Sequence, residues 1–135
     1  VGVPERPVWG ARSGVTRRCV GQRGAGCGQL AGSNRVHILG NATVLADGLK
    51  ADGATLWTEI RVDRVITALK GGNVAIEIND RLKTPSATFI KRAKAAGVRF
   101  TFGSGNTGPN DLGRLAYCVA MIEECRLTPN NRWLA

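Results

Sequence analysis

From Arg35 onward, short apolar runs alternate with amphipathic stretches, a pattern typical of β-α units that share a parallel sheet. The apolar runs at 36–39, 74–79 and 98–102 are rich in β-branched or aromatic residues and are bounded by turn residues. Each of them predicts a strand. The stretch from Asn41 to Trp57 is rich in glycine and aspartate, and it predicts a loop.

A stretch with helical periodicity follows each predicted strand. Thr58 can cap a first helix that ends at Gly71-Gly72, and a second helix is expected to begin at Thr84-Pro85 and to stop at Gly97. The apolar positions repeat at i, i+3, i+4 and i+7, as they do on the buried side of a helix. These inner faces are Val62, Val65, Ile66 and Leu69 in the first helix and Phe89, Ile90 and Ala93 in the second.

A third helix is expected after the turn from Gly103 to Asn110. Asp111 stands where a helix cap belongs, and the helix is expected to end near Arg126. Its predicted inner face consists of Leu112, Leu115, Val119 and Ile122. Together, the three units place residues 35–135 in the α/β class.

Residues 1–34 differ from the rest of the chain in composition and in hydrophobic periodicity. They hold eight glycines and no lysine, and they show neither helical nor strand periodicity. Such a segment buries too little apolar surface to offset the entropy lost on ordering. We expect it to be disordered or a non-native stretch, such as GC-rich DNA translated in a wrong frame; the alternative is a basic arm that binds nucleic acid.

Composition narrows the possible roles. The net charge is +9, but six arginines and a single acid fall within residues 1–35, so the excess is concentrated there and a nucleic-acid partner is not expected. The chain has no apolar run of about 18 residues and no secretory signal, which predicts a cytoplasmic protein without a membrane partner. Cys118 and Cys125 are seven residues apart, too far to bridge along a helix, so we interpret them as reduced packing residues.

Polar side chains gather where the predicted strands end. Because ligands bind beyond the carboxyl ends of parallel strands, these residues are the candidate binding site. Strand alternation also predicts that His37, Leu39 and Asn41 share a pocket-lining face with Ala75, Glu77 and Asn79, while Ile76, Ile78, Phe100 and Phe102 face the helices. The candidates are Asn41 and Thr43 after the first strand, Glu77 and Asn79 closing the second, and Ser104, Asn106 and Thr107 after the third.

Several candidates have a simpler interpretation. Glu77 is either a pocket carboxylate or one half of an ion pair with an arginine, and Asn79 is more typical of a turn residue than of a ligand contact. A lone strand histidine such as His37 is usually a satisfied core residue. The basic run Lys91, Arg92 and Lys94 either binds phosphate or forms the solvated side of a helix.

The segments 74–79, 85–86, 89–98 and 100–104 resemble the closing part of the PHP (polymerase and histidinol phosphatase) family of phosphoesterases. The resemblance covers roughly residues 36–130. It implies a distorted seven-stranded, TIM-like β-α barrel, of which this chain would hold the last three units as a fragment. It also implies a mouth of histidines and acids that binds zinc, manganese or iron to hydrolyse phosphate monoesters.

The chain departs from that family at the metal-binding motifs. The family's H-P-T motif reads Asn41-Ala42-Thr43, and its G-S-D-A-H motif reads Gly103-Ser104-Gly105-Asn106-Thr107. Neutral amide and hydroxyl oxygens are poor substitutes for imidazole and carboxylate ligands. We therefore expect no metal cofactor and assign no catalytic residue. We interpret the chain as a hydrolase-like remnant that is inactive.

Two alternatives to a remnant remain open. The first is a non-catalytic module that keeps the mouth as a pocket for a small phosphorylated or other polar ligand, and the second is nucleic-acid binding by the basic arm. Because three β-α units cannot close a barrel, we also expect exposed sheet edges and self-association through them.

Overall fold

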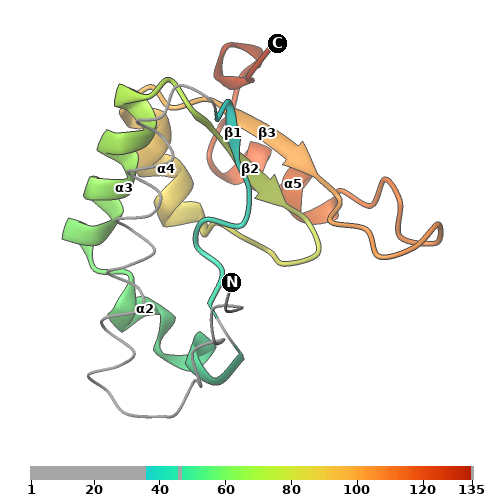
Figure 1. Cartoon of the computed structure of the whole chain (residues 1–135). Coiled ribbons are helices and arrows are strands. Elements are labelled where there is room, and N and C mark those ends of the chain that lie inside the picture. Colours follow the sequence, from blue (N-terminus) through green and yellow to red (C-terminus); the bar gives the residue numbers. More distant parts are fainter. Residues whose placement is uncertain (1–35, 46, 135) are drawn as a thin grey trace, which may run out of the picture.

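The computed structural model describes residues 36–45 and 47–134, and it is an α/β fold built on one parallel sheet (Figure 1). The strands are β1 (Ile38–Leu39), β2 (Ala75–Asn79) and β3 (Phe100–Gly103). Their order in the sheet is β1-β2-β3, and both pairings are parallel. The predicted class and the parallel sheet are confirmed, with each strand starting one or two residues later than expected. Residues 1–34, for which disorder or a non-native origin was expected, lie outside the described residues.

Three helices carry most of the remaining structure. They are α3 (Glu59–Gly71), α4 (Ala87–Ala95) and α5 (Ala116–Glu124). The prediction that residues 41–57 form only a loop is wrong in part. This stretch contains the 3₁₀ helix η1 (Asp47–Asp52) and the short helix α2 (Gly53–Leu56). A last 3₁₀ turn, η2, spans Pro129–Asn131. None of these helices is long and apolar enough to cross a membrane.

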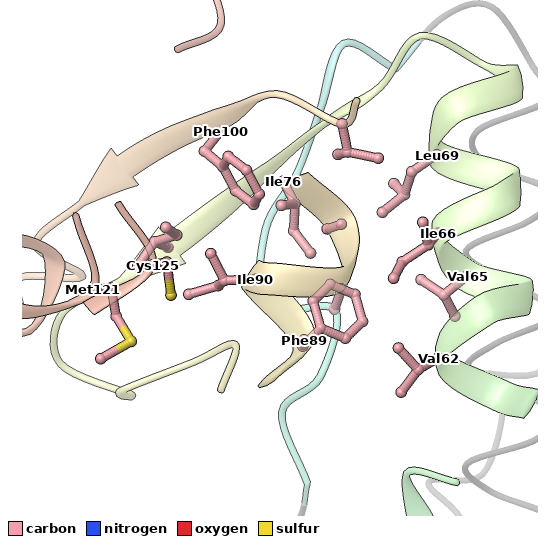
Figure 2. Packing of buried hydrophobic residues seen from close by; sticks show 14 of the residues in the cluster. Val62, Val65, Ile66, Leu69, Ile76, Phe89, Ile90, Phe100, Met121 and Cys125 are labelled. Atoms are coloured by element: carbon pink, nitrogen blue, oxygen red, sulfur yellow. The ribbon is translucent and has the colours of Figure 1, made fainter. Parts of the chain in front are cut away.

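All three helices pack on the same face of the sheet. Ile76 is in register with Phe100, and Ile78 with Phe102, so these side chains project toward the helix layer. They join the buried side of α3 and α4 in a single hydrophobic cluster, part of which Figure 2 shows. The other face of the sheet carries Glu77 beside Thr101 and Asn79 beside Gly103.

The first two helices form as their sequence predicts. Thr58 Oγ1 accepts from the N–H of Arg61 at the start of α3, and the predicted inner face is buried. In α4 the cap is Ser86, whose Oγ accepts from the N–H of Phe89, so this helix begins after the predicted Thr84-Pro85. Thr84 is instead held in a bridge with Asn79.

The predicted inner face of the third helix is wrong. Leu112, Leu115 and Val119 are 68%, 38% and 52% exposed, whereas α5 buries Cys118 and Met121, followed by Cys125. Apolar residues occupy both sides of this helix, so periodicity alone could not select the buried side. Cys118 and Cys125 are free and buried, as expected for packing residues.

Asp111 was also expected to cap this helix, and that prediction is wrong. Asp111 accepts from the N–H groups of Thr107 and Gly108 within the preceding turn. The carboxylate that meets the N-terminus of α5 is Asp80, directly after β2, which accepts from Tyr117 N–H at 2.6 Å and Cys118 N–H at 3.3 Å. A cap distant in sequence therefore ties α5 to the end of the central strand.

For the first strand, the prediction of which side chains face the pocket is wrong. The register pairs Ile38 with Ala75 and Leu39 with Ile76, so Leu39 belongs to the helix side and packs against the core. His37 precedes the strand and is exposed. Asn41 follows it with a φ of 56°, which ends the extended backbone, and strand alternation therefore does not reach this residue.

The basic run on α4 serves contacts between helices. Arg92 pairs with Asp63 at 2.8 Å and with Glu59 at 3.2 Å on α3, and Lys91 pairs with Glu124 of α5 at 3.2 Å. Lys94 donates to the carbonyl oxygens of Cys125 and Arg126. Because the ion pairs are exposed, each contributes little to stability. These contacts instead fix the placement of the helices relative to one another.

We expect Asp80→Ala to lower the free energy of unfolding by about 1 kcal/mol, because two N–H groups at the start of α5 lose their acceptor. Asp52→Ala is the matched control, since Asp52 precedes α2 without a side-chain capping bond. Urea unfolding followed by circular dichroism measures both variants. Equal effects of the two substitutions would contradict the assigned cap.

Candidate functional site

The carboxyl edge of the sheet presents a hydrogen-bonded pair at the end of β2. Asn79 Nδ2 donates to Glu77 Oε1 at 2.8 Å, and Asn79 Oδ1 accepts from the N–H of Leu82 at 3.0 Å. Asn79 is 4% exposed, and a buried amide is stable only when its polar atoms are hydrogen-bonded. Asn79 therefore has the predicted turn role and also orients the carboxylate of Glu77. No lysine or arginine among the described residues pairs with Glu77.

Glycines on the neighbouring strands make room for this pair. A Cβ at Gly103 would lie 2.9 Å from the carboxyl carbon of Glu77, and one at Gly40 would lie 3.8 Å from Oε1. A Cβ at Gly105 would come within 2.6 Å of Asn79 Oδ1, and Gly105 has a φ of +58°. The backbones of the segments after β1 and β3 thus approach the pair closely on both sides.

The turn after β3 is held by its own polar groups. Arg81 Nε donates to the carbonyl oxygen of Gly105 at 2.6 Å, and Ser104 Oγ donates to Asn106 Oδ1 at 3.3 Å. Thr107 donates to Asp111 through both its N–H and its hydroxyl group. The hydrogen bonds from Thr107 and Gly108 hold the pKa of the Asp111 carboxyl below its ordinary value. Among the predicted site residues, Ser104, Asn106 and Thr107 are therefore engaged within the turn.

The residues after β1 reach the same edge but face different surroundings. Asn41 is exposed, and its carbonyl oxygen accepts from Val44 N–H at 3.2 Å. Thr43 lines a neighbouring cleft on the helix side of the edge. The structure thus brings Glu77 and Asn79 into direct contact, while Asn41, Ser104, Asn106 and Thr107 make their hydrogen bonds elsewhere.

The cleft at this edge has a volume of about 950 Å³ and lies between the segment after β1 and the segment after β2. Its apolar walls include Trp57, Val62, Leu82 and Phe89. Two of the cations that line it, Arg81 and Lys83, carry no ion pair within the described part of the chain. A cleft of this size, with apolar walls and a few charged groups, has the features of small-molecule sites in general.

Cys118 lies beneath the edge on the helix side. Its thiol donates to the carbonyl oxygen of Ile78 at 3.3 Å, and burial raises its pKa to about 11. The thiol therefore stays protonated at neutral pH, and a protonated, buried thiol is a poor nucleophile. Cys118 acts as a packing residue under the site.

The metal implied by the family resemblance does not fit these residues. Glu77 is the only acidic residue among the predicted site residues, and the others offer neutral oxygens. In the part of the chain that the structure describes, no group of three or more histidine, cysteine or acidic side chains is placed to hold an ion.

No protein-family model, curated protein or solved structure matches this chain.

Sequence reasoning missed several residues that shape the edge. Asp80 and Arg81 directly follow the polar end of β2, but their partners lie on segments far along the chain. Gly103 and Gly105 fall in the predicted turn, and with Gly40 they leave the room that the Glu77–Asn79 pair occupies. The clustering of three glycines at the ends of neighbouring strands was the signal available for this close approach.

We expect Gly105→Ala to destabilise the fold by about 1–3 kcal/mol, because the new Cβ combines a left-handed backbone with a clash against Asn79. Gly113→Ala is the matched control: its φ is +75°, but a Cβ at this position would meet no atom within 4 Å. Thermal or urea unfolding should show the larger loss at Gly105. A loss at Gly113 as large as that at Gly105 would refute the contact with Asn79.

Proposed function

We propose that this chain is the closing β-α segment of a PHP-like phosphoesterase barrel that lacks metal-dependent hydrolysis. The supporting observation is the Glu77–Asn79 pair at the carboxyl edge, on the face of the sheet away from the helices. In a β-α barrel this face is the interior, and its carboxyl end is the mouth where chemistry takes place. The pair therefore occupies the position expected of residues at a barrel mouth.

The winding of the chain supports the same proposal. Strands that follow each other in sequence also neighbour each other in the sheet, and all three helices lie on one side. An open doubly wound sheet has helices on both faces, whereas a barrel has them only outside. Three consecutive units with helices on one face are the arrangement that an arc of a barrel requires.

The donor set argues against hydrolysis in this chain. Activating water at a metal needs several anionic or imidazole ligands in one place, and here Glu77 is accompanied by amides and hydroxyls. Asn41, Gly105 and Thr107 stand where the family motifs carry histidine, aspartate and histidine. The ancestral reaction would be the hydrolysis of a phosphate monoester.

To test this proposal, the purified chain is incubated with Zn²⁺, Mn²⁺ or Fe²⁺, desalted and analysed for metal, and hydrolysis of p-nitrophenyl phosphate is measured in parallel. We expect substoichiometric metal and no hydrolysis above the metal-only blank. Stoichiometric metal, together with activity that a chelator abolishes, would overturn the proposal.

A paired variant tests the assignment of the mouth. Asn41→His combined with Thr107→His restores the two family histidines at exposed positions on either side of Glu77. The double variant should bind Zn²⁺ more tightly than the parent chain. An unchanged affinity in a variant with parent-like circular dichroism would contradict the barrel-mouth assignment.

A second candidate function is non-catalytic binding of a small phosphorylated ligand. The cleft beside the pair favours it, because Arg81 and Lys83 line the cleft together with apolar walls. Arginine and lysine are the side chains that most often contact phosphate in proteins. This role requires neither a metal nor a reactive side chain.

Inorganic phosphate and phenyl phosphate are the probes for this second candidate. Both should raise the unfolding temperature, and Lys83→Ala should reduce the shift, because one cation of the cleft is lost. Arg114→Ala is the control, since this exposed arginine does not line the cleft. Equal shifts in the two variants would exclude the cleft as the phosphate site.

A further inference from the structure

The amino edge of the sheet, opposite the Glu77–Asn79 pair, carries a different set of side chains. A small surface hollow there, with a volume of about 10 Å³, is lined by Lys70 and Asn73 from the end of α3, Ala75 and Arg99 from the strand starts, and Trp133 from the C-terminal tail. Figure 1 shows the tail at the same end of the sheet as the end of α3. We call these residues the amino-edge hollow.

Backbone hydrogen bonds fix the aromatic residue of this hollow. Trp133 N–H donates to the carbonyl oxygen of Phe100 at 2.8 Å, and Arg132 forms a parallel bridge with Phe100. The tail therefore runs alongside the start of β3 and is joined to it by an isolated bridge. Because Arg132 is level with Phe100, the next residue, Trp133, projects to the opposite face, on which Thr101 and Ala75 lie. The indole ring is half-buried, and its centroid lies 6.5 Å from that of His37.

The charge at this hollow is positive. Lys70 and Arg99 line it, Arg132 is exposed beside Trp133, and no acidic residue contributes to the lining within the described part of the chain. None of the three cations forms a salt bridge with a described acid. The described acids that pair with cations do so on the helix layer or in η1. An anionic partner thus meets unneutralised charge at this edge.

We propose that the surface around the amino-edge hollow binds single-stranded nucleic acid, with a base stacked on Trp133, one phosphate contacted by Arg99 on the same face and a neighbouring phosphate contacted by Arg132 from the other side of the tail. Aromatic rings flanked by cations are the combination by which proteins bind single strands without a sequence code. The side chain of Asn73 adds amide donors and acceptors that can reach a base edge. The site is separate from the carboxyl edge and does not depend on the function proposed there. It includes no residue of the arginine-rich segment 1–34.

The test measures binding of a fluorescein-labelled single-stranded dodecamer to the full chain by anisotropy, over a range of salt concentrations. The double variant Arg99→Ala/Arg132→Ala should weaken binding at least ten-fold and lower the slope of log K against log salt by roughly one unit per arginine. Both residues are exposed, so the fold should be retained.

The control is Arg64→Ala/Arg114→Ala, which removes the same charge from exposed positions away from the hollow. It should weaken binding far less than the first variant. Residues 1–34 are present in both proteins, so any binding by that segment contributes equally. Equal losses in the two double variants would overturn the proposal, as would a larger loss in the control.

Trp133→Leu separates stacking from charge. It should weaken single-strand binding at least about five-fold without changing the salt slope, and Trp133→Phe should restore most of the affinity. A duplex of the same sequence should bind less tightly, because its bases are not free to stack. Tighter binding of the duplex, or of phosphatidylserine vesicles through the same arginines, would contradict a single-strand site.

Discussion

At the end of β2, the buried amide of Asn79 ties the central strand to the turn that follows it. Its Nδ2 donates to Glu77, its Oδ1 accepts from Leu82, and its backbone exchanges hydrogen bonds with Thr84. A buried amide deprived of these partners would cost about 1–3 kcal/mol. The adjacent Asp80 caps α5 from the same strand end. Two consecutive residues therefore fix the turn toward α4, the carboxylate of Glu77 and the start of α5.

The two faces of the sheet differ in the side chains that they carry. On one face, Ile76, Ile78 and Phe100 pack against the helices without polar atoms to satisfy. On the other face, polar and small residues alternate with them. Gly103 and Gly105 approach the Glu77–Asn79 pair so closely that neither position has room for a side chain. Hydrophobic packing thus sets the position of the strands, and the polar groups at their ends are placed as a consequence.

Much of this fold could be predicted from the sequence. In α3 and in β2 the spacing of the apolar residues fits only one type of secondary structure and only one buried side. The errors arose where the pattern was ambiguous. In α5 apolar residues surround the helix, and only contact with Ile78 and the strand ends selects Cys118 as the buried side. In β1 two residues were too few to define faces, and pairing with β2 decided them.

Partners distant in sequence account for the remaining failures at the site. Asp80 and Tyr117 are 37 residues apart, and Arg81 and Gly105 are 24 residues apart, so no local motif indicates either bond. The placement of Glu77 and Asn79 at the strand end was predictable from alternation. The mutual hydrogen bond was not, because Glu77 was expected to be either a pocket carboxylate or the partner of an arginine.

A double-mutant cycle on the free energy of unfolding tests the central claim that Asn79 holds Glu77 in place. It compares Glu77→Ala, Asn79→Ala and the double variant with the parent chain. A bond between a buried amide and a carboxylate predicts a coupling of about 0.5–3 kcal/mol between the two substitutions. Effects that add to within about 0.3 kcal/mol would contradict the account.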